Sequence, residues 1–191
     1  MIPAFVLHLL AAFPLCARAA EAEVQPPFGL AWDEPALALE ESLMGGSGRI
    51  VERKKTRGGE SWYVEGLPQA ALQRAVFHLH ANRLGGVELQ YGKDDWTPET
   101  YDAFMQSVKT RLEAKHGPGV LIARKQETER GLLQTLLGYR WEQPSGSIEL
   151  VYFAAQNPAN LFRSVSLHYA AAVAPAASVS SAPPLPPLPV K

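Results

Sequence analysis

NRLGGVELQY, the stretch from Asn82 to Tyr91, returns without gaps as NLFRSVSLHY from Asn160 to Tyr169. The matched positions lie two apart, and the corresponding pairs are Val87 with Val165, Leu89 with Leu167, and Tyr91 with Tyr169. Apolar residues at every second position are typical of a strand that buries one face. A match at such a long separation indicates a duplicated supersecondary unit, so the two segments are predicted to be related strands.

Each of these strands is preceded by a helix signal. Asp33 and Thr97 each follow a Trp and precede an acidic, proline-bearing first turn, which is the pattern of a helix N-cap. The preceding Trp is then placed to pack as a hydrophobic staple, against Leu37 in the first helix and Tyr101 in the second. The second helix is expected to bury one face made of Tyr101, Phe104, Met105, Val108 and Leu112.

Four strand-like runs follow each helix. The runs are Arg49–Lys55, Ser61–Glu65, Leu72–Ala81 and Leu84–Tyr91 in the first half, and Val120–Lys125, Leu137–Glu142, Ser147–Gln156 and Leu161–Tyr169 in the second. The segment 127–136 is open to two interpretations, a helical turn or the start of a strand. The sequence therefore predicts an α+β fold, with a duplicated helix plus four-stranded antiparallel sheet unit and the helices packed on one sheet face. The two units, 28–93 and 94–172, are expected to form a single globular domain.

The two ends of the chain differ from this core. Residues 2–15 are almost wholly apolar, too short for a membrane span of about 20 residues, and they lead into the small-x-small site Ala17-Arg18-Ala19. We expect a signal peptide over 1–19, cleaved near Ala19, and hence a periplasmic or secreted protein; lipidation of Cys16 is the alternative. Residues 20–27 are expected to be a short linker. The Pro- and Ala-rich residues 173–191 are expected to be a disordered tail.

Composition excludes several classes of function. A formal net charge of −1 over 191 residues argues against a general nucleic-acid binder. Cys16 is the single cysteine, so a protein cleaved near Ala19 has neither disulfide nor thiol chemistry. The chain has no GxSxG or SxxK motif, so covalent catalysis lacks its usual activated group. We expect no cofactor and no catalytic residue.

His78 and His80 are the best candidates for an enzyme site. Residues i and i+2 of a strand point to one face, where two imidazoles could hold a metal ion. The sequence places no third ligand beside them, and histidines that alternate with Phe77 and Leu79 also fit half-exposed positions of an ordinary strand. A small envelope hydrolase or metal-dependent enzyme that uses His78 and His80 is therefore an alternative function.

Two surfaces are candidates for binding. The basic hairpin 49–57, with Arg53, Lys54 and Lys55, could contact anionic lipid headgroups or an acidic protein, or could simply protect a solvated sheet edge from aggregation. Trp62 and Trp141 lie on corresponding strands. They form an aromatic binding patch if they point to an open sheet face, and they belong to the core if they point inward.

The order of elements and the entry Phe28-Gly29-Leu30-x-Trp32 into a short helix resemble two groups of small bacterial envelope proteins. These are the SmpA/OmlA-type (BamE-type) outer-membrane lipoproteins and the tandem-repeat β-lactamase-inhibitor proteins, and the likeness covers roughly Phe28 to Tyr169. It implies a non-catalytic protein-binding module of the cell envelope and carries over no particular functional residue. The resulting expectation is an exported, periplasmic binding or accessory module with an envelope protein as partner; contact with a membrane surface is an alternative.

Overall fold

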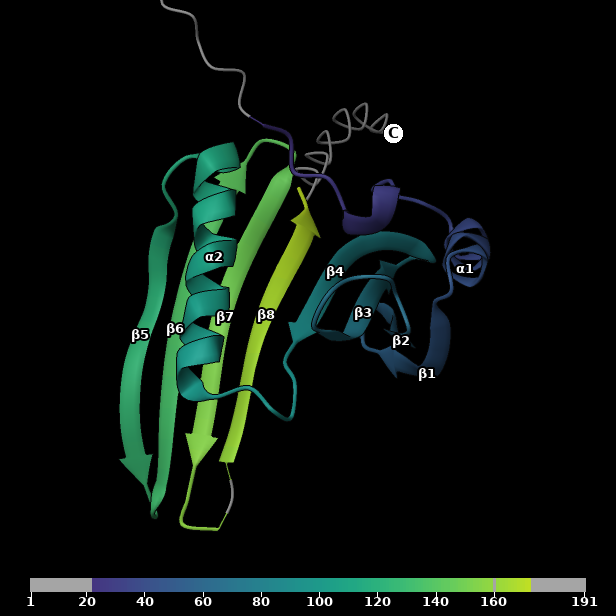
Figure 1. Cartoon of the computed structure of the whole chain (residues 1–191). Coiled ribbons are helices and arrows are strands. Elements are labelled where there is room, and N and C mark those ends of the chain that lie inside the picture. Colours follow the sequence, from purple (N-terminus) through teal and green to yellow (C-terminus); the bar gives the residue numbers. More distant parts are fainter. Residues whose placement is uncertain (1–21, 160, 173–191) are drawn as a thin grey trace, which may run out of the picture.

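A computed structural model describes residues 22–159 and 161–172 of the chain (Figure 1). The expected signal peptide over 1–19, the alternative lipidation of Cys16 and the expected tail over 173–191 all lie outside these residues. In the part that is described, no helix is both long and apolar enough to cross a membrane.

The described residues form two α-helices, one short 3-10 helix and eight strands. The first half contains η1 (Pro27–Gly29), α1 (Ala36–Gly45), β1 (Arg49–Thr56), β2 (Gly59–Glu65), β3 (Leu72–His80) and β4 (Arg83–Tyr91). The second half contains α2 (Pro98–His116), β5 (Val120–Glu129), β6 (Leu132–Gln143), β7 (Gly146–Gln156) and β8 (Leu161–Ala171). Every expected strand is present, and the ambiguous segment 127–136 belongs to strands β5 and β6, which a tight turn joins.

The eight strands form one sheet. Their order is β1-β2-β3-β4-β8-β7-β6-β5, and β4 pairs with β8 from Gly86–Ala170 to Tyr91–Val165. The prediction of a duplicated helix plus four-stranded sheet unit is therefore wrong. Separate four-stranded sheets would leave the N–H and C=O groups along β4 and β8 unpaired, and pairing these two strands with each other satisfies them. The coarser prediction, an α+β protein with an antiparallel sheet, is confirmed.

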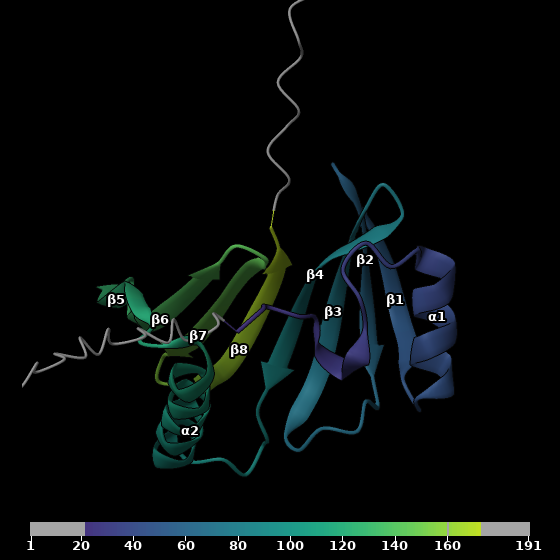
Figure 2. The same ribbon diagram turned by 90° about the horizontal axis from the view of Figure 1, so that it is seen from above.

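The sheet bends where β4 meets β8. Figure 2 shows its two halves turned away from each other at this seam, with α2 on the β5–β8 half and α1 at the outer end of the β1–β4 half. Side chains from both halves nonetheless belong to one buried cluster, which includes Phe77, Leu89, Leu150 and Leu167. The described chain is therefore built around a single core.

Helix α2 begins as the sequence predicts. The Thr97 hydroxyl oxygen accepts a hydrogen bond from the Thr100 backbone N–H at 3.3 Å, which satisfies one of the free donors of the first turn. The Trp96 and Tyr101 rings meet edge to face with centroids 5.0 Å apart. The predicted cap and hydrophobic staple are both confirmed.

Helix α1 begins later than the sequence predicts. Asp33 has a φ of 60° and its backbone N–H donates to the Leu84 carbonyl oxygen at 3.0 Å. This bond ties the segment to β4, so the helix starts only after Pro35, without a side-chain cap. Leu37 is 71% exposed, so the cap and staple predicted for α1 are wrong.

The described part of the expected linker 20–27 packs against the domain. Val24 is only 1% exposed. Its backbone N–H donates to the Ser145 hydroxyl at 2.7 Å, and its carbonyl oxygen accepts from Trp32 Nε1 at 2.9 Å. The segment that enters the domain is thus held between the β6–β7 turn and the start of the first half.

Candidate ligand-binding site

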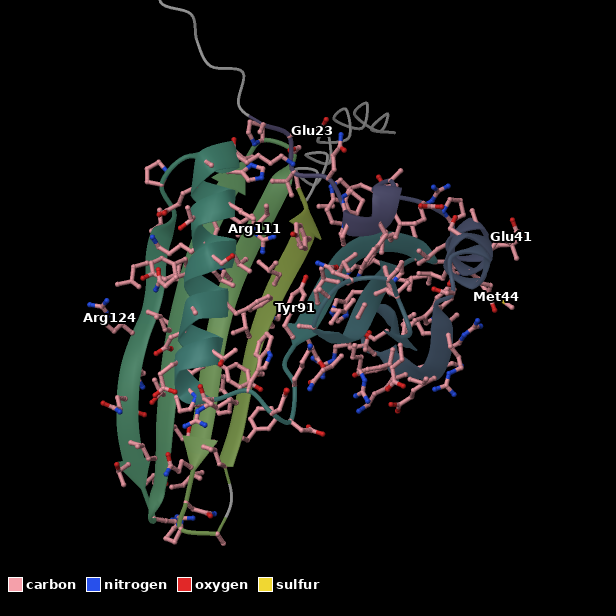
Figure 3. All side chains as sticks on the ribbon, in the orientation of Figure 1. Glu23, Glu41, Met44, Tyr91, Arg111 and Arg124 are labelled. Atoms are coloured by element: carbon pink, nitrogen blue, oxygen red, sulfur yellow. The ribbon has the colours of Figure 1, made fainter. Side chains whose placement is uncertain are left out.

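A cavity of about 380 Å³ lies between α2 and the seam of β4 and β8. Figure 3 shows Arg111 of α2 and Tyr91 of β4 in the space between α2 and the β1–β4 half of the sheet. The volume falls in the range of roughly 300–1,000 Å³ that small-molecule sites occupy. The lining residues are Gln25, Gln69, Ala70, Tyr91, Phe104, Val108, Arg111, Leu112, Lys115, His116, Ile148, Leu167 and Tyr169.

One part of the cavity wall is apolar. Phe104, Val108 and Leu112 follow one another at intervals of four residues, so they lie in one row along α2. Ile148 of β7 and Leu167 of β8 form the sheet side, and both are almost fully buried. The cavity is therefore the incompletely filled part of the interface between helix and sheet.

Two tyrosines, Tyr91 and Tyr169, supply polar atoms to the cavity beside Arg111. The Tyr91 hydroxyl oxygen accepts a hydrogen bond from Gln69 Nε2 at 2.6 Å, which leaves its own O–H free to donate. Burial raises the pKa of Tyr91 and of Tyr169, and the nearby Arg111 guanidinium opposes that rise in pKa at both rings. Both side chains are consequently neutral phenols that can donate hydrogen bonds.

Two cations stand at the mouth. Arg111 and Lys115 are one helical turn apart, both are exposed, and neither forms an ion pair within the described part of the chain. The neighbouring acid on the helix, Glu113, is already paired with Lys109, whose Nζ lies 2.7 Å from its carboxylate. Burial lowers the pKa of His116, so this ring is neutral near neutral pH. Within residues 22–159 and 161–172, no Asp or Glu lines the cavity, so the charged side chains that line it there are positive.

Trp62 and Trp141 lie in the core. Each is 2% exposed, and each indole N–H is satisfied internally, from Trp62 to Glu60 Oε2 and from Trp141 to the Gly117 carbonyl oxygen, both at 2.9 Å. The pleat explains this placement, because both residues occupy the same sheet face as the buried row through Leu89 and Leu167. They shape the interior and offer no exposed aromatic patch.

The basic hairpin contains two paired cations. Arg49 lies 3.4 Å from the Glu65 carboxylate. Arg53 approaches Glu40 of α1 to 2.6 Å and its guanidinium carbon lies 4.4 Å from the centre of the Trp62 ring. Lys54 and Lys55 are exposed and occupy successive positions of β1, so they point to opposite faces of the strand. Since β1 is an edge of the sheet, this arrangement fits the protection of that edge.

His78 and His80 have separate surroundings. His78 Nδ1 lies 3.0 Å from the Ser61 hydroxyl, whereas the exposed His80 ring lies 3.4 Å from the Gly58 carbonyl oxygen. Burial lowers the pKa of His78, and Glu88 opposes that lowering of the pKa. Among residues 22–159 and 161–172, no three His, Cys, Asp or Glu side chains are grouped so that they could hold a metal ion.

Sequence reasoning predicted the apolar face of α2 but missed the site beside it. The missing signal was the position of Arg111 and Lys115, three residues after Val108 and Leu112, which puts both cations at the border of that face. The contribution of the β4–β8 seam could not be anticipated before the two strands were known to pair. No protein-family model, characterised protein or solved structure matches this chain.

Proposed function

We propose that this protein is an exported, periplasmic, non-catalytic binding module whose ligand occupies the cavity between α2 and the β4–β8 seam. One observation carries the proposal: the cavity is already formed, and apolar and polar side chains from α2 and the sheet converge on it. This combination is typical of sites that bind small molecules. The apolar run of residues 2–15 and the small-x-small site at Ala17-Arg18-Ala19 support the location.

The chemistry at the cavity supports binding rather than catalysis. A general acid or base should have a pKa near the working pH, but burial moves the pKa of Tyr91 and Tyr169 upward, away from neutrality. Among the described residues, no Asp or Glu lines the cavity beside Arg111 or Lys115. The His116 ring, whose pKa burial lowers, is neutral near neutral pH. These groups are suited to hold a ligand in place.

Fluorescence of the neutral dye N-phenyl-1-naphthylamine tests the proposal, because its emission rises in apolar surroundings. We expect saturable binding to the purified protein. Ala70→Trp should weaken it at least about tenfold, or about 1.4 kcal/mol, because Ala70 is an exposed residue at the rim of the cavity. The matched control is Ala114→Trp, which places the same side chain on an exposed position of α2 that does not line the cavity.

The two variants give a clear decision once circular dichroism has shown that both are folded. Loss of dye binding in Ala70→Trp alone supports the cavity as the binding site. Absence of dye binding to the parent protein, or equal binding by the parent and both variants, contradicts the proposal.

A further inference from the structure

We infer that the ligand is an amphipathic monoanion, a medium-length acyl chain that ends in a carboxylate. This inference rests on the proposed function and adds the chemical class of the ligand. The acyl chain would lie between α2 and the sheet, and the carboxylate would sit at the mouth with Arg111, Lys115 and the Tyr91 hydroxyl.

The charges around the cavity select an anion. The whole chain carries a formal net charge of −1, yet the charged side chains that line the cavity in the described part of the chain are Arg111 and Lys115, with no Asp or Glu among them. The two cations are neighbours on one helix face, and like charges at this spacing repel each other. A bound carboxylate would relieve that repulsion, and the planar Arg111 guanidinium can donate two parallel hydrogen bonds to it.

The hydrogen-bonding groups agree with the charges. An ionised carboxylate only accepts hydrogen bonds, so its site must offer donors. Tyr91 offers its hydroxyl proton, since its oxygen is already the acceptor for Gln69 Nε2. Arg111 lies close enough to Tyr91 and Tyr169 to oppose the rise of both pKa values. The cation and the phenol donors thus face the same space.

The apolar part of the cavity surface favours an acyl chain of limited length. Phe104, Val108, Leu112, Ile148 and Leu167 line it without a polar side-chain atom. A volume of about 380 Å³ lies at the small end of the roughly 300–1,000 Å³ that small-molecule sites occupy. Decanoate, with a ten-carbon chain of medium length, is therefore a suitable probe.

Competition against N-phenyl-1-naphthylamine tests the inference, with three ligands of equal chain length: decanoate, decanol and decyltrimethylammonium. Decanoate should displace the dye at a concentration at least about tenfold lower than either of the others, as expected for one charge-assisted contact of about 1.4 kcal/mol. The advantage should shrink when salt is added, because the cations at the mouth are exposed.

Two double variants locate the anion. Arg111→Gln with Lys115→Gln should remove most of the advantage of decanoate and leave decanol unchanged. The matched control, Lys54→Gln with Lys55→Gln, removes the same charge from the basic hairpin and should behave as the parent. The inference is overturned if all three ligands compete equally, or if only the hairpin variant loses decanoate binding.

The outcomes also separate the two proposals. Dye binding that Ala70→Trp blocks, combined with equal competition by decanoate and decanol, would leave the cavity as a binding site and reject the anionic ligand. Absence of both dye and decanoate binding would reject the site itself.

Discussion

Leu89 and Leu167 lie directly opposite each other where β4 and β8 join, at the centre of the sheet. They are 1% and 5% exposed. Val87 faces Tyr169 and Tyr91 faces Val165 on either side of them, so the two segments that match in sequence pair with each other in antiparallel orientation. The resulting apolar row joins the halves of the sheet and provides, through Leu167, part of the wall of the cavity.

The first prediction concerns this row. Leu89→Ala should reduce the free energy of unfolding by about 2–5 kcal/mol, because it leaves a cavity among well-packed neighbours. Leu37→Ala, at a position that is 71% exposed, is the matched control and should change stability by less than about 0.5 kcal/mol. Urea denaturation measures both. Equally small losses of stability in Leu89→Ala and Leu37→Ala would contradict a central role of the β4–β8 seam in stability.

The pairing of β4 with β8 is the part of the fold that the sequence did not predict. The alternation of Val87, Leu89 and Tyr91 was enough to predict a strand, since side chains alternate between faces with a period of two. Which strand it pairs with depends on long-range backbone hydrogen bonds, and the pattern of one strand carries no information about those. For this reason the strands were predicted while the single eight-stranded sheet was not.

A second prediction contrasts two glycines. Gly59→Ala should destabilise the protein by about 1–3 kcal/mol, because a Cβ there would overlap the Leu79 carbonyl oxygen on the neighbouring strand. Gly45→Ala, where an added Cβ meets no atom within 4 Å, lies at the end of α1 and should be neutral or stabilising by up to about 1 kcal/mol. Thermal unfolding of both variants measures the two changes in stability. A Gly45→Ala variant that is destabilised, together with a Gly59→Ala variant that is not, would contradict the prediction.

The third prediction tests the start of α2. Thr97→Ala should cost about 1 kcal/mol, because the Thr100 N–H loses its side-chain acceptor. Thr97→Ser retains a hydroxyl and should stay close to the parent. The cost should appear in the midpoint of urea unfolding, and an unchanged midpoint in Thr97→Ala would show that the cap is unimportant.

The fourth prediction follows from the lowered pKa of His78. Burial is the main cause, His168 and His80 lower the pKa further, and Glu88 raises it. The unfolded ring therefore takes up a proton at a higher pH than the folded one, so stability falls as pH drops below about 6.5. His116 contributes in the same direction.

His78→Gln should lose the part of the pH dependence of stability that His78 contributes and retain the part that His116 contributes. Urea denaturation at about pH 7.5 and about pH 5.5, on either side of the ordinary histidine pKa, provides the comparison. A loss of stability between these two pH values that is as large in His78→Gln as in the parent would contradict the assignment.

The site was less predictable than the fold for a related reason. Phe104, Val108 and Leu112 were recognisable as a buried helix face, and Trp62 and Trp141 as strand residues on one side of the sheet or the other. Their roles depend on which side the helices cover and on how fully the contact fills the space beneath α2. How much of that space is filled depends on the volumes of side chains from separate strands, such as those of Ile148 and Leu167. The periodicity of the sequence carries no information about these volumes.

The most direct test of the account is the backbone amide NMR spectrum of the labelled protein during titration with decanoate. Binding in the cavity predicts saturable shifts along α2 from 104 to 116 and at the other residues that line it, with little change elsewhere. Those other residues are Gln25, Gln69, Ala70, Tyr91, Ile148, Leu167 and Tyr169. Shifts confined to the basic hairpin 49–57, or to the sheet face around Ser61 and His78, would contradict it.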